Sequence, residues 1–127
     1  MRYLLDTHAV IWYLEDSPLL PSKTKEIIDD NDHGIFLSSI SLWEIAIKVN
    51  LGKLNLATPF DAFLDNIKRG DFVVLQIQDD YLKMLTTLPV IHKDPFDRLL
   101  IATAQAEDLT IITVDESIHK YDVAWIW

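Results

Sequence analysis

Short apolar runs alternate with helix-like segments along the chain, and this alternation limits the possible folds more than any other feature. Apolar runs over residues 2–5, 35–37, 72–75 and 110–113 have the length of buried strands. Strands that alternate with helices form a mainly parallel sheet. The sequence therefore predicts an α/β fold, with a last short strand over residues 123–127.

Apolar residues at helical spacing fill the segments between these runs. They predict helices over residues 7–15, 21–30, 40–51, 58–68 and 94–107, and a further helix that contains Tyr81 and Leu85 and ends before Pro89. No repeat, low-complexity tract or linker divides the 127 residues. We therefore expect a single domain over residues 1–127.

Composition excludes several classes of protein. The chain has no cysteine, which rules out disulfides, thiolate zinc sites and cysteine nucleophiles. Its net charge of −9 argues against a broad basic surface for nucleic acid, but suits an enzyme that meets phosphates through bound cations, or a partner with a basic arm. No apolar run approaches the roughly 20 residues of a membrane span, and no signal-peptide pattern precedes Asp6, so we expect a cytoplasmic protein without a membrane partner.

Two acids come just after predicted strands. Asp6 follows the run over residues 2–5, and Asp115 follows the run over residues 110–113. In open parallel sheets, ligands bind beyond the carboxyl ends of the strands. The alternative is that each acid only caps the helix or turn that follows it.

Glu44 stands alone on a predicted helix that is apolar around most of its circumference. It is the only acid between His33 and Phe60, and it shares a narrow polar stripe with Ser41 and Lys48. A buried carboxylate costs on the order of several kcal/mol unless it is paired or binds a metal. The alternative is an ion pair with Lys48, worth only about 0.3–0.5 kcal/mol.

The segment from Asp94 to Arg98 is typical of the start of a helix. Pro95 suits the first helical position, and Asp94 before it is a natural N-cap. Asp97 then occupies the third helical position, where the helix dipole favours a carboxylate. Asp97 is less needed for capping than Asp94, so it is the stronger candidate for a functional site.

Four carboxylates that converge would repel one another and raise their own pKa values. A hard divalent cation removes this conflict, and one or two Mg²⁺ ions would activate a water for phosphodiester hydrolysis. The candidate catalytic residues and ligands of Mg²⁺ or Mn²⁺ are therefore Asp6, Glu44, Asp97 and Asp115. Thr7 and Thr113 are candidates to hold these ligands in place, although strand threonines are often plain β-formers.

Four short motifs occur in order and cover nearly the whole chain. They are Leu4-Leu5-Asp6-Thr7-His8-Ala9, Ser41-Leu42-Trp43-Glu44, Asp94-Pro95-Phe96-Asp97-Arg98-Leu99-Leu100-Ile101-Ala102 and Thr113-Val114-Asp115. Together they resemble the motifs of PIN-domain ribonucleases, and most closely those of VapC toxins from bacterial and archaeal toxin–antitoxin pairs. Each motif alone is weak, but four in this order and spacing are specific.

This resemblance implies a three-layer α/β/α sandwich and endonucleolytic cutting of RNA that depends on Mg²⁺ or Mn²⁺. It implies that the acidic quartet consists of Asp6, Glu44, Asp97 and Asp115, and it makes Asp94 and Arg98 supporting residues. It also implies a toxin homodimer and inhibition by a cognate antitoxin that inserts a segment near the site.

An acidic chain that cuts RNA needs local positive charge. Lys48, Lys93 and Arg98 are the candidates to contact RNA, and the alternative for each is solvent exposure or pairing with nearby acids. His8 and His92 are possible bases, but solvated or capping roles are more typical of such residues, and a metal-bound water would need no histidine.

Two other classes of protein also suit acids at strand ends. One is another Mg²⁺-dependent phosphoryl-transfer enzyme such as a phosphatase, or an acidic receiver-like domain. An aspartyl-phosphate phosphatase would need a second Asp where His8 stands, and a receiver would need adjacent acids early in the chain. The other class is a non-catalytic module whose acids bind a metal or a partner.

Overall fold

The computed structural model describes residues 1–127 as alternating strands and helices. The strands are β1 (Arg2–Leu5), β2 (Gly34–Ser38), β3 (Phe72–Leu75), β4 (Thr110–Ile112) and β5 (Trp125–Ile126). The helices are α1 (Thr7–Leu14), α2 (Ser22–Asp29), α3 (Ser39–Asn50), α4 (Phe60–Arg69), α5 (Asp79–Thr86), α6 (Pro95–Glu107) and α7 (Glu116–His119). This order confirms the predicted α/β fold.

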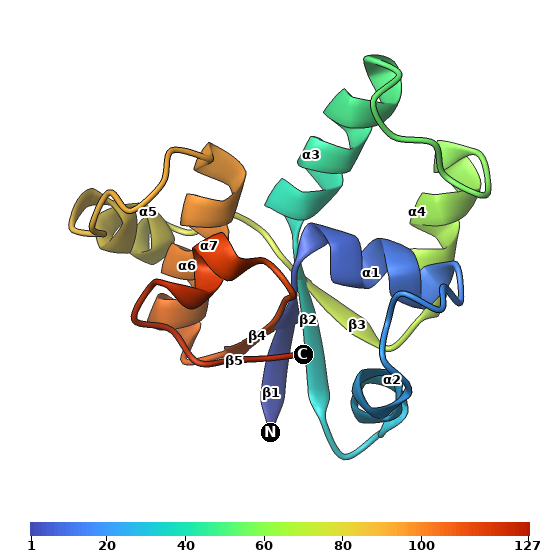
Figure 1. Ribbon diagram of the computed structural model, residues 1–127, viewed down its shortest axis with the longest axis horizontal. Helices are drawn as coiled ribbons and strands as arrows, with labels where there is room; N and C mark the ends of the chain where they lie inside the picture. Colours follow the sequence, from blue (N-terminus) through green and yellow to red (C-terminus); the bar gives the residue numbers. More distant parts are fainter.

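The five strands form one parallel sheet in the order β3-β2-β1-β4-β5. β1 lies at its centre, where Leu4 is the register partner of Phe36 in β2 and Leu5 is the register partner of Ile112 in β4. In a parallel sheet all the carboxyl ends lie at the same edge. The residues that follow β1, β2 and β4 are therefore brought together there (Figure 1).

Helices cover both faces of the sheet because successive strand side chains point to opposite faces. On one face, Leu5 and Leu37 pack in a core with side chains of α1, α2, α3 and α4. On the other face, Leu4 and Ile111 pack in a second core with side chains of α6 and α7. Figure 1 shows α6 and α7 on one side of the strands and α1 and α4 on the other. The three-layer α/β/α architecture is thus confirmed.

Capping side chains fix where the helices of the carboxyl edge begin. Asp94 accepts hydrogen bonds from the backbone N–H groups of Phe96 and Asp97, at 2.9 and 3.2 Å, and Pro95 is the first residue of α6, as predicted. The side chains of Asp6 and Asp115 cap α1 and α7 in the same way.

The elements differ from the predicted ones in detail, and most bounds shift by one or two residues; α4, for example, begins at Phe60 where residue 58 was predicted. The short helix α7 was not predicted, because four residues are too few to show a helical period. β4 ends at Ile112, one residue earlier than predicted, and β5 pairs over only two residues of the predicted last strand. None of the helices is both long enough and apolar enough to span a membrane.

Candidate active site

The carboxyl edge of the sheet gathers the four acids that the sequence singled out. Asp6 comes directly after β1, and Asp115 lies beyond the end of β4. Glu44 lies on α3, which follows β2, and Asp97 lies in the first turn of α6. β1, β2 and β4 are neighbouring parallel strands (Figure 1), so the acids that follow them come to the same edge from different parts of the chain.

Asp6 is buried at the centre of this edge, with 4% of its surface exposed. Its Oδ1 accepts a hydrogen bond from the Ala9 N–H at 2.8 Å, and its Oδ2 accepts one from the Thr113 hydroxyl at 2.5 Å. Burial raises the pKa of Asp6 above its ordinary value, and the charge of Asp115 adds to the rise. The fold therefore holds this carboxylate rigidly where its charge is unfavourable.

Glu44 is the second buried carboxylate, with 5% exposure. Its Oε1 accepts a hydrogen bond from the Thr7 hydroxyl at 2.7 Å, and its Oε2 lies 2.7 Å from Lys48 Nζ. This hydrogen bond to Glu44 raises the pKa of Lys48, and the charges of Asp94 and Asp97 contribute to the rise. Lys48 therefore pairs with Glu44, the alternative considered from the sequence, and also lies within the field of the neighbouring acids.

Asp97 has the most perturbed acidity of the partly exposed acids. Burial raises its pKa to about 6, and the charges of Asp94, Asp115 and Glu44 contribute to this rise, although a hydrogen bond from His92 opposes it. Repulsion of this kind requires the carboxylates to lie within electrostatic reach of one another. Asp94, Asp115 and Glu44 therefore lie within electrostatic reach of Asp97, and Asp115 also lies within reach of Asp6.

Thr113 links the two acids that follow strands. Its buried hydroxyl donates to Asp6 Oδ2 and accepts the N–H of Asp115 at 3.0 Å. One carboxylate oxygen of Asp115 caps α7 by accepting the N–H of Ser117 at 2.8 Å. Thr7 and Thr113 therefore both hold site carboxylates, one at Glu44 and the other at Asp6.

The basic candidates lie in different surroundings. Lys93 is exposed just before Asp94. Arg98 instead folds back onto its own chain, where Nη1 donates to the carbonyl of Pro89 at 2.8 Å and to the hydroxyl of Tyr121 at 3.1 Å. Its guanidinium is thus committed to the segment that leads into α6.

His92 and Tyr121 belong to the site, although the sequence did not connect them with Asp97. His92 Nε2 lies 3.1 Å from Asp97 Oδ2, and His92 Nδ1 lies 2.8 Å from the Tyr121 hydroxyl. Burial lowers the pKa of His92, but its hydrogen bonds to Tyr121 and Asp97 outweigh this and raise it overall. Tyr121 is separated from His92 by 29 residues, and no periodicity of the sequence signals this contact.

The donor set has the chemistry of a site for a hard divalent cation. Its carboxylates are oxygen ligands of the kind Mg²⁺ prefers. Burial raises the pKa values of Asp6 and Asp97, and a cation would offset the repulsion that adds to this rise. No three of the Asp, Glu and His side chains form a ready-made ligand cluster, and Lys48 supplies the counter-charge of Glu44. A divalent ion would therefore compete with Lys48 for Glu44.

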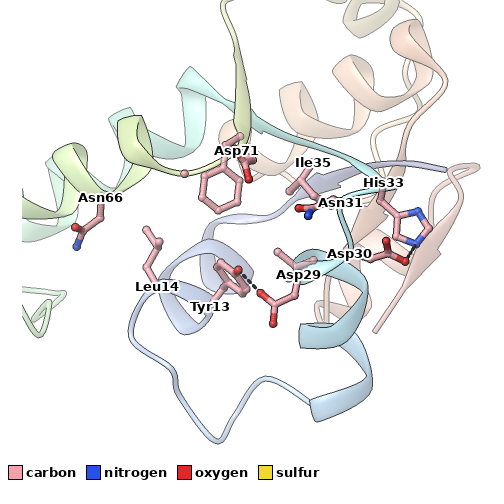
Figure 2. Close-up of a pocket in the computed structure, with 12 residues that line it drawn as sticks. Tyr13, Leu14, Asp29, Asp30, Asn31, His33, Ile35, Asn66 and Asp71 are labelled. Atoms are coloured by element: carbon pink, nitrogen blue, oxygen red, sulfur yellow. Dashed lines mark hydrogen bonds and ion pairs between the residues drawn. The ribbon is translucent and has the colours of Figure 1, made fainter.

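A pocket lies elsewhere, at the amino ends of β2 and β3. It measures about 630 Å³ and is lined by Tyr13, Asp29, Asp30, His33 and Asp71, among others. Figure 2 shows the Tyr13 hydroxyl directed at Asp29, and the His33 ring directed at Asp30. This pocket contains none of the acids that the sequence predicted as a site.

Comparison with known proteins agrees with this geometry. The sequence matches the PIN domain family over residues 3–124. No curated protein sequence matches the chain significantly.

Solved structures share the fold over almost the whole chain. VapBC2 of Rickettsia felis, bound to a promoter DNA fragment, has a TM-score of 0.75 at 19% identity and covers 99% of this chain and 98% of its own. FitAcB of Neisseria gonorrhoeae has a TM-score of 0.70 at 19% identity, with 98% and 96% covered. A toxin–antitoxin complex of Klebsiella pneumoniae has a TM-score of 0.65 at 17% identity, with 98% and 96% covered. At these identities the likeness concerns the fold, whereas the sequence match over residues 3–124 establishes that the chain belongs to the PIN domain family.

Proposed function

We propose that this protein is a metal-dependent endoribonuclease that hydrolyses RNA phosphodiester bonds and acts as the toxin of a toxin–antitoxin pair. The main support is that four carboxylates, Asp6, Glu44, Asp97 and Asp115, lie at one edge of the sheet, where burial raises the pKa of Asp97 to about 6 and the charges of Asp94, Asp115 and Glu44 contribute to the rise. Membership of the PIN domain family points to the same chemistry.

In this proposal the four carboxylates hold one or two Mg²⁺ or Mn²⁺ ions. When bound, such an ion lowers the pKa of a water molecule and stabilises the leaving oxygen of a phosphodiester. The hydroxyls of Thr7 and Thr113 hold Glu44 and Asp6 in orientation. Asp94 supports the site by fixing the start of α6 and by adding negative charge beside Asp97.

Local positive charge would bring RNA to this acidic protein. We assign this role to Lys48 and Lys93, since Lys48 lies among the acids and Lys93 is exposed beside Asp94. Arg98 borders the same surface but donates to Pro89 and Tyr121, so we assign it a supporting role. RNA bound here would be held mainly through its phosphates, and binding should weaken as salt is raised.

Two protein partners belong to the same proposal. One is a cognate antitoxin, because the similar structures include a complex described as toxin–antitoxin. The other is a second copy of this chain. Trp43 on α3 is 58% exposed and packs edge-on against Phe96, whereas Trp12 packs against Trp127. Trp43, the most exposed of the tryptophans, is therefore a suitable fluorescence reporter of dimer formation.

Cleavage of RNA by the purified protein tests the enzymatic part of the proposal. Single-stranded or structured RNA should be cut internally in Mg²⁺ or Mn²⁺, and cutting should stop in excess EDTA and resume when the ion is restored. Cleavage that continues unchanged in EDTA would contradict a metal-dependent mechanism.

Growth of a bacterial host tests the toxin part. Expression without an antitoxin should slow growth, and Glu44→Gln should relieve this effect at equal protein levels, because the variant removes a ligand charge. Normal growth during wild-type expression would contradict the toxin role, while leaving the nuclease assignment to the cleavage assay.

A further inference from the structure

The segment that leads into α6 is fastened by one side chain. Arg98 Nη1 donates to the carbonyl of Pro89 at 2.8 Å, and Nη2 donates to the carbonyl of Leu88 at 3.4 Å. The same Nη1 donates to the Tyr121 hydroxyl at 3.1 Å. Arg98 therefore ties Tyr121, which follows α7, to the segment that contains His92.

The Tyr121 hydroxyl has several hydrogen-bond partners. Its oxygen accepts from Arg98 and from the backbone N–H of His92, both at 3.1 Å, and lies 2.8 Å from His92 Nδ1. Only 5% of Tyr121 is exposed. Two donors already occupy its oxygen, so its single proton has two possible acceptors: His92 Nδ1 at 2.8 Å, or the His92 carbonyl at the longer distance of 3.4 Å.

Because two donors already occupy the Tyr121 oxygen, the ring proton of neutral His92 lies on Nε2, the nitrogen that faces Asp97. When His92 is neutral, the Tyr121 proton goes to the nearer acceptor, Nδ1, and the ring proton must lie on Nε2. When His92 is protonated, both ring nitrogens carry protons. In either state Nε2 is a donor, and it faces Asp97 Oδ2 at 3.1 Å.

The consequence for Asp97 is that its two oxygens are no longer equivalent. Oδ2 is held by His92, whereas Oδ1 accepts no hydrogen bond from the chain. Nε2 of His92 cannot act as a general base while it donates to Asp97 Oδ2. The base role considered for His92 from the sequence therefore does not suit this arrangement. Carboxylates that bind metals are commonly held by such partners, and losing the partner costs about 10- to 100-fold in metal affinity or activity.

We propose that His92, locked by the Tyr121 hydroxyl and Arg98, is a positioning residue that holds Asp97 Oδ2 and so orients Oδ1 toward the acidic site. This inference rests on the proposed function for its consequence, a bound divalent ion. The arrangement of the three side chains is a property of the metal-free chain and can be tested separately.

Two conservative variants of His92 separate this role from a merely structural one. Gln places its side-chain nitrogen near the position of Nε2, so His92→Gln keeps a donor for Asp97 and loses the Nδ1 contact with Tyr121. Asn places its side-chain atoms near the position of Nδ1, so His92→Asn keeps a contact with Tyr121 and loses the donor for Asp97. If His92 only fastens the segment to Tyr121, Asn should be the better replacement.

Mn²⁺ affinity, measured by electron paramagnetic resonance of the free ion, should rank wild type and His92→Gln above His92→Asn. We expect a loss of about 10- to 100-fold for Asn and of about threefold or less for Gln. The kcat of RNA cleavage should follow the same order, with little change in the KM for RNA. Tyr121→Phe should lie between the two, because it keeps the ring and removes only the hydroxyl that fixes the imidazole.

Two readouts on metal-free protein complete the test. Nitrogen-15 spectra of wild type should show His92 protonated at Nε2, and a crystal structure of His92→Asn should show the Asp97 carboxylate turned away from its wild-type orientation. If Asn equals or exceeds Gln in Mn²⁺ affinity, or neutral His92 carries its proton only on Nδ1, the inference is wrong. Wild-type protein that neither binds Mn²⁺ nor cuts RNA would overturn the proposed function, even with Asp97 oriented as described.

Discussion

Acids lie at both ends of the parallel sheet, but their surroundings differ between the two ends. At the amino end, Asp29, Asp30 and Asp71 line an open pocket of about 630 Å³, and two of them are met by Tyr13 and His33 (Figure 2). At the carboxyl end, Asp6 and Glu44 are buried, and Asp97 is repelled by the acids around it. The proposed site is therefore distinguished by the unfavourable placement of its charges and not by the size of a pocket.

The difference follows from what the fold provides at each end. Carboxyl ends of parallel strands are followed by helix starts, whose free N–H groups and positive dipole ends attract acids. Asp6, Asp94 and Asp115 all cap helices there. Helix capping explains why each of these acids is tolerated alone. It does not explain why several lie close enough to raise the pKa of Asp97.

The largest expected effect is on cleavage. Asp97→Asn keeps the shape of the side chain and removes its charge, and it should lower kcat more than about 100-fold, because losing a partner of a ligand already costs 10- to 100-fold. The matched control is Asp71→Asn in the amino-end pocket, which should cut RNA at the wild-type rate. Equal losses in the two variants would remove the distinction between the two ends.

Metal binding should stabilise the wild-type protein. Mn²⁺ at about 100 times its Kd should add about 2.7 kcal/mol to the free energy of unfolding, measured as a rise in melting temperature. Asp71→Asn should show the same rise and Asp97→Asn a much smaller one. A rise that survives Asp97→Asn but disappears in Asp71→Asn would place the ion at the wrong end of the sheet.

The pH dependence of the free energy of unfolding, measured on metal-free protein, provides a third contrast. Asp97 has a pKa of about 6 in the fold against an ordinary value of 3.8, so it holds its proton more tightly when folded. The stability it contributes is fully present below pH 3.8 and is lost as pH rises through about 6. The raised pKa values of Asp6 and His92 act in the same direction.

Asp97→Asn should therefore be more stable than wild type at pH 8, by about 1–2 kcal/mol. The full shift corresponds to at most about 3 kcal/mol, and partial exposure of the side chain reduces it. Denaturant titrations at pH 5 and pH 8 measure the effect. A variant less stable than wild type at pH 8 would show that burial and neighbouring charges do not disfavour the ionised form of Asp97.

The sequence indicated that four candidate acids lie at one edge of the sheet, with Thr7, Thr113 and Lys48 beside them, and the structure shows these contacts. The sequence did not predict the partners of Asp97, for a physical reason. Asp6 and Asp115 follow strands, and strand order in a parallel sheet brings them together without knowledge of any side-chain contact. The Asp97–His92–Tyr121 contacts depend instead on how the residues after α7 pack against the segment before α6. Hydrophobic periodicity carries no information about such packing.

The contacts of Arg98 were also beyond what the sequence could predict. On the sequence it is a cation beside an acid, which suggested a contact with RNA. In the structure it folds back to the carbonyls of Leu88 and Pro89, a contact that depends on the path of the segment before α6. The amino-end pocket was not predicted either, because residues of α1, α2 and α4 and of the segments before β2 and β3 meet there only in the folded chain.

The smallest predicted effect concerns RNA affinity. Lys93→Ala removes one exposed charge beside the site, and it should weaken RNA binding about fivefold at 0.1 M salt and reduce the salt dependence by about one phosphate contact. Lys53→Ala, an exposed lysine in the loop after α3, is the control and should leave both unchanged. Fluorescence anisotropy with labelled RNA at several salt concentrations measures both quantities. Equal effects of the two variants would mean that RNA responds only to net charge.

Anomalous diffraction from a crystal soaked in Mn²⁺ tests the central claim most directly. We predict a manganese peak among the carboxylates of Asp6, Glu44, Asp97 and Asp115, with Lys48 displaced from Glu44. A crystal with no peak at the carboxyl end of the sheet, or with manganese only in the pocket of Asp29, Asp30 and Asp71, would contradict the account.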